Sequence, residues 1–199
     1  MFKNIEVNSS AQQILAQLAS DTNLGVMAAS ISVDKEFISQ RVVFTIRSNS
    51  KFSGWTIDNS KTVESVRNTI KLVGFQSQLD IVEGIADLIA NDFNTVRYPI
   101  HGIGLSVQDS IIDQLKVYYL MRIYNQVSLK EDVMGKIDRE LAIKTLSRIM
   151  EELGLHDDGD KLFSISSIMD RENYELEFIG INFEKGKTPG LKVYFRPVS

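Results

Sequence analysis

Three short runs of the sequence place basic residues at both ends of a strand-like pattern. Side chains alternate between the two faces of a β-strand, so residues two positions apart share a face. The basic residues that would share a face within each run are Arg41 with Arg47, Lys116 with Arg122, and Lys192 with Arg196. Tyr118 and Tyr194 lie inside the second and third runs. Several Lys and Arg side chains on one sheet face can bind a multiply charged anion, while tyrosines beside them offer π-faces to an organic group.

A sheet face that simply meets water is the alternative for any one of these runs. An antiparallel sheet commonly packs one face on the core and exposes its polar face to solvent. The repetition of one pattern in three runs makes a shared binding face an equally good interpretation. The sequence therefore leaves both interpretations open.

Each run is the second strand of a predicted β-hairpin. The last hairpin joins a strand over 175–183 to one over 191–196 through turn residues at 184–190. The middle hairpin repeats it, because "IGLSV…QLKVYYLMR" is similar to "IGINF…GLKVYFRPV". A looser third copy spans 29–47. Internal similarity of this kind indicates a repeated structural unit.

Helical patterns separate the predicted hairpins. They cover about 10–19, 61–73 and 76–91, and a further helix begins at the capping box Ser128–Glu131 and ends at Gly154. We therefore predict an α+β fold of repeated helix–β-hairpin (ααββ-like) units, with an antiparallel sheet or partial barrel and helices on its outer face. No stretch is typical of a linker, so residues 1–199 are predicted to form a single domain.

The composition excludes several classes of functional site. The 199 residues contain no cysteine, which excludes disulfide scaffolds, thiolate zinc sites, iron–sulfur clusters and cysteine nucleophiles. The net charge of −4 argues against a dedicated nucleic-acid binder. The N-terminal residues lack a signal-peptide pattern, and no apolar run reaches the roughly 20 residues of a membrane span. We expect a cytoplasmic protein with no membrane contact.

Two other groups of residues could act as metal ligands or in catalysis, but a structural or surface role is favoured for each. The cluster His156-Asp157-Asp158-Gly159-Asp160 lacks the spacing of a calcium-binding loop and is typical of an exposed turn. His101 is far from the other histidine in the sequence, which favours a structural or surface role. We predict no metal site from either group.

The hairpins resemble the ABBA-type aromatic prenyltransferases, which consist of repeated ααββ units around an antiparallel barrel. The segment "LKVYF" after a Gly-containing turn is similar to the second strand of such a unit, and "EELGLH" at Glu151–His156 is similar to the end of a helix in that family. The stretch "LFSISSIMDRENYELEFIGINF" is similar to the strands that follow. The chain is shorter than members of that family, so the resemblance implies a shortened or divergent member.

This resemblance implies an enzyme that transfers an allylic prenyl group from a prenyl diphosphate to an aromatic small-molecule acceptor. The residues that would bind the diphosphate are Arg41, Arg47, Lys116, Arg122, Lys192 and Arg196. Tyr118 and Tyr194 would be the catalytic residues that shield the allyl cation. A requirement for Mg²⁺, the acceptor, the donor length and assembly into a homo-oligomer stay open. The alternative is a non-catalytic relative that binds an anionic or aromatic small molecule or acts as a partner subunit.

Overall fold

The fold combines helices with antiparallel β-hairpins along the whole described chain. The computed structural model describes residues 9–21, 24–33, 38–46, 52–53, 56–57, 59–93, 98–108, 111–121, 138–155, 159–171 and 174–197. In chain order the elements are α1 (Ser9–Ser20), β1 (Leu24–Val33), β2 (Ile38–Ile46), β3 (Phe52–Ser53), β4 (Thr56–Ile57), α2 (Ser60–Leu72), the 3-10 turn η1 (Gln76–Gln78), α3 (Leu79–Phe93), β5 (Ile100–Gln108), β6 (Ile111–Leu120), α4 (Arg139–Glu152), α5 (Gly159–Arg171), β7 (Tyr174–Glu184) and β8 (Gly190–Pro197).

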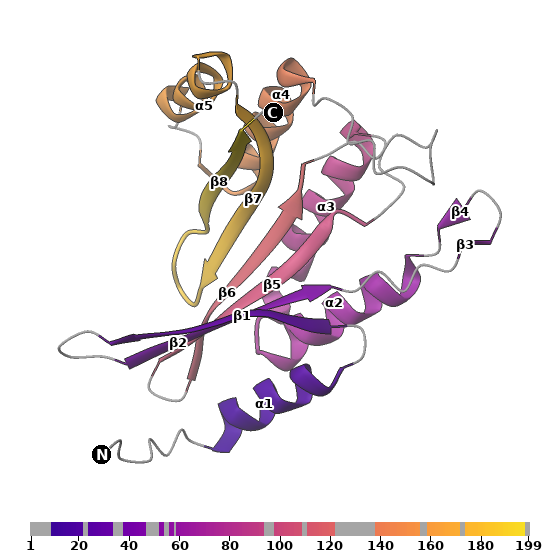
Figure 1. The fold of residues 1–199 in the computed structure, drawn as a ribbon, viewed down its shortest axis with the longest axis vertical. Coiled ribbons are helices and arrows are strands. Elements are labelled where there is room, and N and C mark those ends of the chain that lie inside the picture. The colour runs from indigo at the N-terminus through magenta and orange to yellow at the C-terminus, as the bar shows by residue number, and fades with distance from the viewer. Residues whose placement is uncertain are drawn as a thin grey trace.

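Six of the strands form one antiparallel sheet. Its order is β1-β2-β5-β6-β7-β8, so each hairpin pairs with the hairpin that follows it in the sequence. The two short strands β3 and β4 form a separate ladder. The large sheet is not closed into a barrel, and β1 and β8 are its two edges (Figure 1). The predictions of an α+β class and an antiparallel sheet are confirmed.

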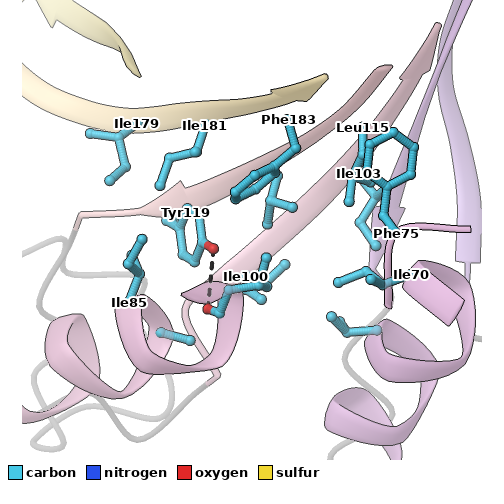
Figure 2. Packing of buried hydrophobic residues seen from close by; sticks show 14 of the residues in the cluster. Ile70, Phe75, Ile85, Ile100, Ile103, Leu115, Tyr119, Ile179, Ile181 and Phe183 are labelled. Carbon is cyan, nitrogen blue, oxygen red and sulfur yellow. Dashed lines mark hydrogen bonds between the residues drawn. The ribbon is translucent and has the colours of Figure 1, made fainter. Parts of the chain in front are cut away.

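The helices pack on one face of this sheet and leave the other face open. The fully buried strand residues that face the helices include Ile103 and Leu105 on β5, Leu115, Val117 and Tyr119 on β6, and Ile179, Ile181 and Phe183 on β7. They alternate along each strand, as a half-buried strand requires. The helices contribute buried residues at helical spacing, including Ile70 of α2 and Ile85 of α3 (Figure 2).

The prediction of strands from Leu162 onward is wrong for the first half of that stretch. Residues 159–171 form α5, and the strand β7 begins only at Tyr174. The spacing of Leu162, Ile165 and Met169 gives α5 one apolar side, and Met169 is 1% exposed. The alternating Ser and Ile residues of this stretch match a strand equally well, because short runs satisfy both periods.

The structure describes only the end of the acidic cluster and none of the predicted capping box. Gly159 and Asp160 begin α5 rather than lying in a turn. Residues 156–158 and the predicted capping box at 128–131 lie outside the described residues. Helix α4 begins at Arg139, so the predicted start of this helix at Ser128–Glu131 is wrong. Asp138 has an extended backbone, and its carboxylate accepts a hydrogen bond from the backbone N–H of Leu141 at 3.1 Å.

Replacing Asp138 with alanine is expected to lower the free energy of unfolding by about 0.5–2 kcal/mol. The carboxylate satisfies a backbone N–H that has no partner within the helix, and its negative charge lies at the N-terminus of α4. Urea unfolding measures the difference. Lys144→Ala, at an exposed position of the same helix, is the control and should change the value by less than about 0.5 kcal/mol. Equal effects of the two substitutions would contradict a capping role.

No helix in the part of the chain that the structure describes is both long and apolar enough to cross a membrane.

Candidate functional site

The sheet face opposite the helices, which we call the open face, contains the predicted site residues that the structure describes. Residues paired directly across neighbouring strands share a face. One row of such pairs is Val43, Gly104, Lys116 and Asn182. The next row is Thr45, Gly102, Tyr118, Gly180 and Lys192. Arg41 lies one row away from Lys116, opposite Ser106, and Tyr194 lies one row away from Lys192, opposite Phe178. Arg47 and Arg122 lie outside the described residues.

Lys116, Tyr118 and Tyr194 form a compact cluster at the centre of the open face. The Lys116 ammonium group donates a hydrogen bond to the Tyr194 hydroxyl over 2.6 Å. The Lys116 Nζ atom is 4.9 Å from the centre of the Tyr118 ring and 5.1 Å from the centre of the Tyr194 ring. The two ring centres are 6.2 Å apart, at an interplanar angle of 49°. The ammonium is therefore held by two cation–π contacts and one hydrogen bond.

Glycines on the neighbouring strands make this arrangement possible. A Cβ atom on Gly180 would lie 2.6 Å from Cε of Lys116, so the lysine side chain crosses β7 over a position that has no side chain. A Cβ atom on Gly104 would lie 3.3 Å from Cε2 of Tyr118, so the tyrosine ring rests on β5. As a result Lys116 is only 8% exposed, although it lies on the face opposite the helices.

Gly102→Ala is expected to lower the free energy of unfolding by about 1–3 kcal/mol. The new Cβ would lie 2.9 Å from the backbone carbonyl oxygen of Phe44 on β2, and a backbone atom inside a sheet cannot move aside freely. The matched variant is Gly84→Ala in α3, where a Cβ meets nothing within 4 Å. That variant should be more stable than the unmodified protein by about 0.5–1 kcal/mol, since Gly disfavours helix interiors. Thermal unfolding that ranks the two variants in the opposite order would contradict this packing.

The electrostatics of the cluster keep Tyr118 in its neutral form. Burial raises the pKa of Tyr118 above its usual value, and the neighbouring Tyr194 raises it further. The nearby Arg41 acts in the opposite direction but does not reverse the shift. Tyr118 can therefore offer a π-face and a hydroxyl group near neutral pH, but no phenolate.

Arg196 is engaged by a carboxylate. Its Nη2 atom donates a hydrogen bond over 2.8 Å to Oε2 of Glu175, which is 9% exposed. This pair lies on the edge hairpin β7–β8, and the negative charge of Glu175 offsets the positive charge that Arg196 would offer to an anion. Of the predicted diphosphate ligands that are described, Arg41, Lys116 and Lys192 are thus better suited to bind an anion than Arg196.

Asn182 is not among the residues that the sequence pattern predicts, because the basic and tyrosine residues of that pattern lie on the second strand of each hairpin. Asn182 is on the first strand, β7, directly opposite Lys116. Among the described residues its Oδ1 atom is buried and has no hydrogen-bond partner. An unpaired buried acceptor lowers stability, so a donor group that reaches it would gain a hydrogen bond. The alternation of Gly180 and Asn182 with the buried Ile179 and Ile181 was the signal that could have identified it.

Aromatic and apolar side chains lie next to the cluster. Phe178 is directly opposite Tyr194 on β8 and Leu120 on β6. The ring of His101 packs against Phe178, with the ring centres 5.3 Å apart. Desolvation lowers the pKa of His101, and the charge of Glu177 acts against this shift. His101 is therefore placed to act as a neutral packing partner, and the open face offers an apolar area beside its cations.

A hollow lies away from the open face, between α4 and α5. It has a volume of about 500 Å³, and its lining includes Arg139 and Asp170, which form an ion pair of 2.9 Å. The charges of Arg139 and Asp170 offset each other, and Glu140 and Lys144 add one charge of each sign to the lining. No group of three or more His, Cys, Asp or Glu residues that could hold a metal ion occurs in the described part of the chain.

No protein-family model, no curated protein and no solved structure matches this chain.

Proposed function

We propose that the open face binds a prenyl diphosphate and that the chain transfers the prenyl group to an aromatic small molecule. The observation that supports this most is the Lys116 ammonium held between the rings of Tyr118 and Tyr194. It brings a cation for the diphosphate and two π-faces for an allyl cation within one cluster. The resemblance to ABBA-type prenyltransferases and the cysteine-free composition are compatible with this chemistry.

The diphosphate would bind through Lys116, Lys192 and Arg41. Lys192 and Arg41 are exposed, and Lys116 becomes accessible when the hydroxyl of the partly exposed Tyr194 moves away from its ammonium group. The apolar tail of the donor would lie over Tyr194 and Phe178, which are opposite each other. Charge-assisted hydrogen bonds to a phosphate are about twice as strong as neutral ones, so the cations would dominate recognition of the head group.

Transfer would begin with cleavage of the bond between the allylic carbon and the diphosphate oxygen. The electron pair stays on the diphosphate, whose growing charge the cations stabilise. The allyl cation lies against the tyrosine rings. A carbon of the aromatic acceptor then forms the new bond and loses its proton to the released diphosphate. The buried Oδ1 atom of Asn182 would accept a hydrogen bond from a hydroxyl or N–H group of the acceptor.

Binding without turnover is the second candidate function. The large sheet is not closed into a barrel, so its open face has no protein layer above it in the described part of the chain. Water would then reach an allyl cation and compete with the acceptor. This feature favours a non-catalytic relative that binds an anionic or aromatic small molecule, or a partner subunit.

The absence of cysteine fits a reducing compartment, and we include a cytoplasmic location in the proposal.

Calorimetry and product analysis on the same preparation distinguish these functions. The titrants are dimethylallyl diphosphate, geranyl diphosphate and inorganic diphosphate, with and without Mg²⁺. Prenylated phenols or indoles detected by mass spectrometry would support transfer. Binding of geranyl diphosphate without any product would support the non-catalytic candidate. If none of the diphosphates binds and no product forms, prenyl transfer and diphosphate binding are both excluded.

A further inference from the structure

Helix α1 and strand β1 present a surface that is almost free of charge. Between residues 9 and 33 the only Asp, Glu, Lys or Arg is Asp21, although 24% of the whole chain is charged. Asp21 is half-buried and accepts a hydrogen bond of 3.5 Å from the hydroxyl of Ser65 on α2. Neither α1 nor β1 contains a charged residue. Depletion of charge is typical of the central part of a protein–protein interface.

β1 is an edge strand of the sheet. It pairs with β2 on one side, and no described strand lies on its other side (Figure 1). All of the residues from Val26 to Ser30 are exposed, with Val26 at 57% and Met27 at 56%. Since successive side chains point to opposite faces, both faces of this part of β1 are uncovered.

The opposite edge of the sheet is protected in a way that β1 is not. The edge strand β8 carries Lys192, Arg196 and Pro197. Charged residues and proline on an edge strand prevent pairing with strands of other molecules. β1 has ten residues with no charge and no proline, and a single register shift between Val26 and Ala28 is its only irregularity. An unprotected strand of this length is expected to pair with another strand.

We propose that β1 is the contact between two copies of this chain, paired antiparallel to each other across a twofold axis. In such a pair each β1 lies against the same uncharged residues of its counterpart, so no like charges meet. Pairing through β8 would instead bring the basic residues Lys192 and Arg196 of one copy near the same two residues of the second copy. A charged peptide would find no complementary charge on β1 or on α1, which packs against it.

The twofold axis closes the assembly at two copies. The axis that relates antiparallel neighbouring strands is perpendicular to the sheet, so the two sheets would join into one continuous sheet. The open faces of both copies would then lie on the same side, and the helices of both copies on the other. The uncharged helix α1 of one copy would lie near α1 of the second copy and enlarge the contact beyond the strands.

The mass in solution tests the proposal. Light scattering during size-exclusion chromatography should give twice the chain mass of 22.5 kDa at micromolar concentration. Ala28→Lys places a charge on the exposed edge strand and should raise the dissociation constant at least about tenfold. Phe163→Lys is the control, because it adds the same charge at the most exposed large apolar residue, 74% exposed on α5. It should leave the mass unchanged.

Single cysteines test the geometry independently of charge. The chain has no cysteine, so a cysteine introduced at each position from Val26 to Ser30 is the only one present. Oxidation should link two copies at the positions nearest the twofold axis, where Cα atoms approach within about 7 Å. A cysteine at Thr188, before β8, should give no link. The proposal is overturned by a monomer at about 100 µM, by open-ended oligomers, or by dissociation with Phe163→Lys but not with Ala28→Lys. Circular dichroism of each variant excludes loss of folding as the cause.

Discussion

Tyr119→Ala is expected to lower the free energy of unfolding by about 3–5 kcal/mol, the range for large buried aromatic residues. Tyr119 is fully buried on the helix-facing side of β6, and its hydroxyl donates a hydrogen bond of 3.1 Å to the backbone carbonyl oxygen of Val82 on α3 (Figure 2). The substitution removes the ring and this contact between the sheet and α3. Burial also raises the pKa of Tyr119 far above its usual value, so the group stays neutral across the range in which the protein would be studied.

Two further variants separate the contributions of the ring and the hydroxyl. Tyr119→Phe keeps the ring and should lower the free energy of unfolding by about 1 kcal/mol, the usual value of a hydrogen bond. Tyr118→Ala makes the same change at the next residue, which is only half-buried on the open face, and should lower it by less than about 2 kcal/mol. Chemical denaturation of the three variants gives the values. A larger loss of unfolding free energy for Tyr118→Ala than for Tyr119→Ala would contradict the placement of Tyr119 in the core and Tyr118 on the open face.

Lys116→Met is expected to weaken binding of geranyl diphosphate by about 10–100-fold, since a hydrogen bond to a charged group contributes about 1.5–3 kcal/mol. Methionine keeps most of the length and the apolar stem of the side chain, so the contacts with Tyr118 and Tyr194 are largely retained. The Tyr194 hydroxyl, on a residue that is 36% exposed, can bond to water instead. Calorimetric titration measures the change in affinity.

Gly180→Ala tests whether the position of the Lys116 charge matters as well as its presence. The new Cβ would lie 2.6 Å from Cε of Lys116 and 3.2 Å from the Tyr194 ring, so the ammonium must move while the net charge stays the same. Affinity for geranyl diphosphate should fall in this variant too. Lys144→Met, at an exposed position on α4, is the control for the loss of one positive charge. Unchanged affinity in both Lys116→Met and Gly180→Ala would exclude this cluster as the diphosphate site.

The strand faces could be predicted from the sequence because they depend only on alternation. The division of β6 into Lys116 and Tyr118 on one face and Val117 and Tyr119 on the other agrees with the register and burial in the structure. The sequence alone does not identify α5 as a helix, because its short apolar spacing fits both the helix and the strand period. The packing of this segment against α4 favours the helix.

The contacts within the cluster could not be predicted from alternation. Lys116 and Tyr194 are 78 residues apart in the sequence and lie on strands that are not adjacent, since β7 separates β6 from β8. Their contact depends on a side chain that crosses an intervening strand over Gly180. The ion pair between Arg196 and Glu175 could not be predicted from alternation either. The sequence pattern identifies the basic residue but not the carboxylate that pairs with it.

Two glycines of the open face lower the stability of the strands that contain them. Gly104 and Gly180 are buried within β5 and β7, strands that have neighbours on both sides. Each glycine in a strand interior costs about 0.5–1 kcal/mol relative to alanine, because it loses more conformational freedom on folding. Residues that reduce stability and at the same time set the position of a lysine and a tyrosine are typical of a surface selected for what it contacts.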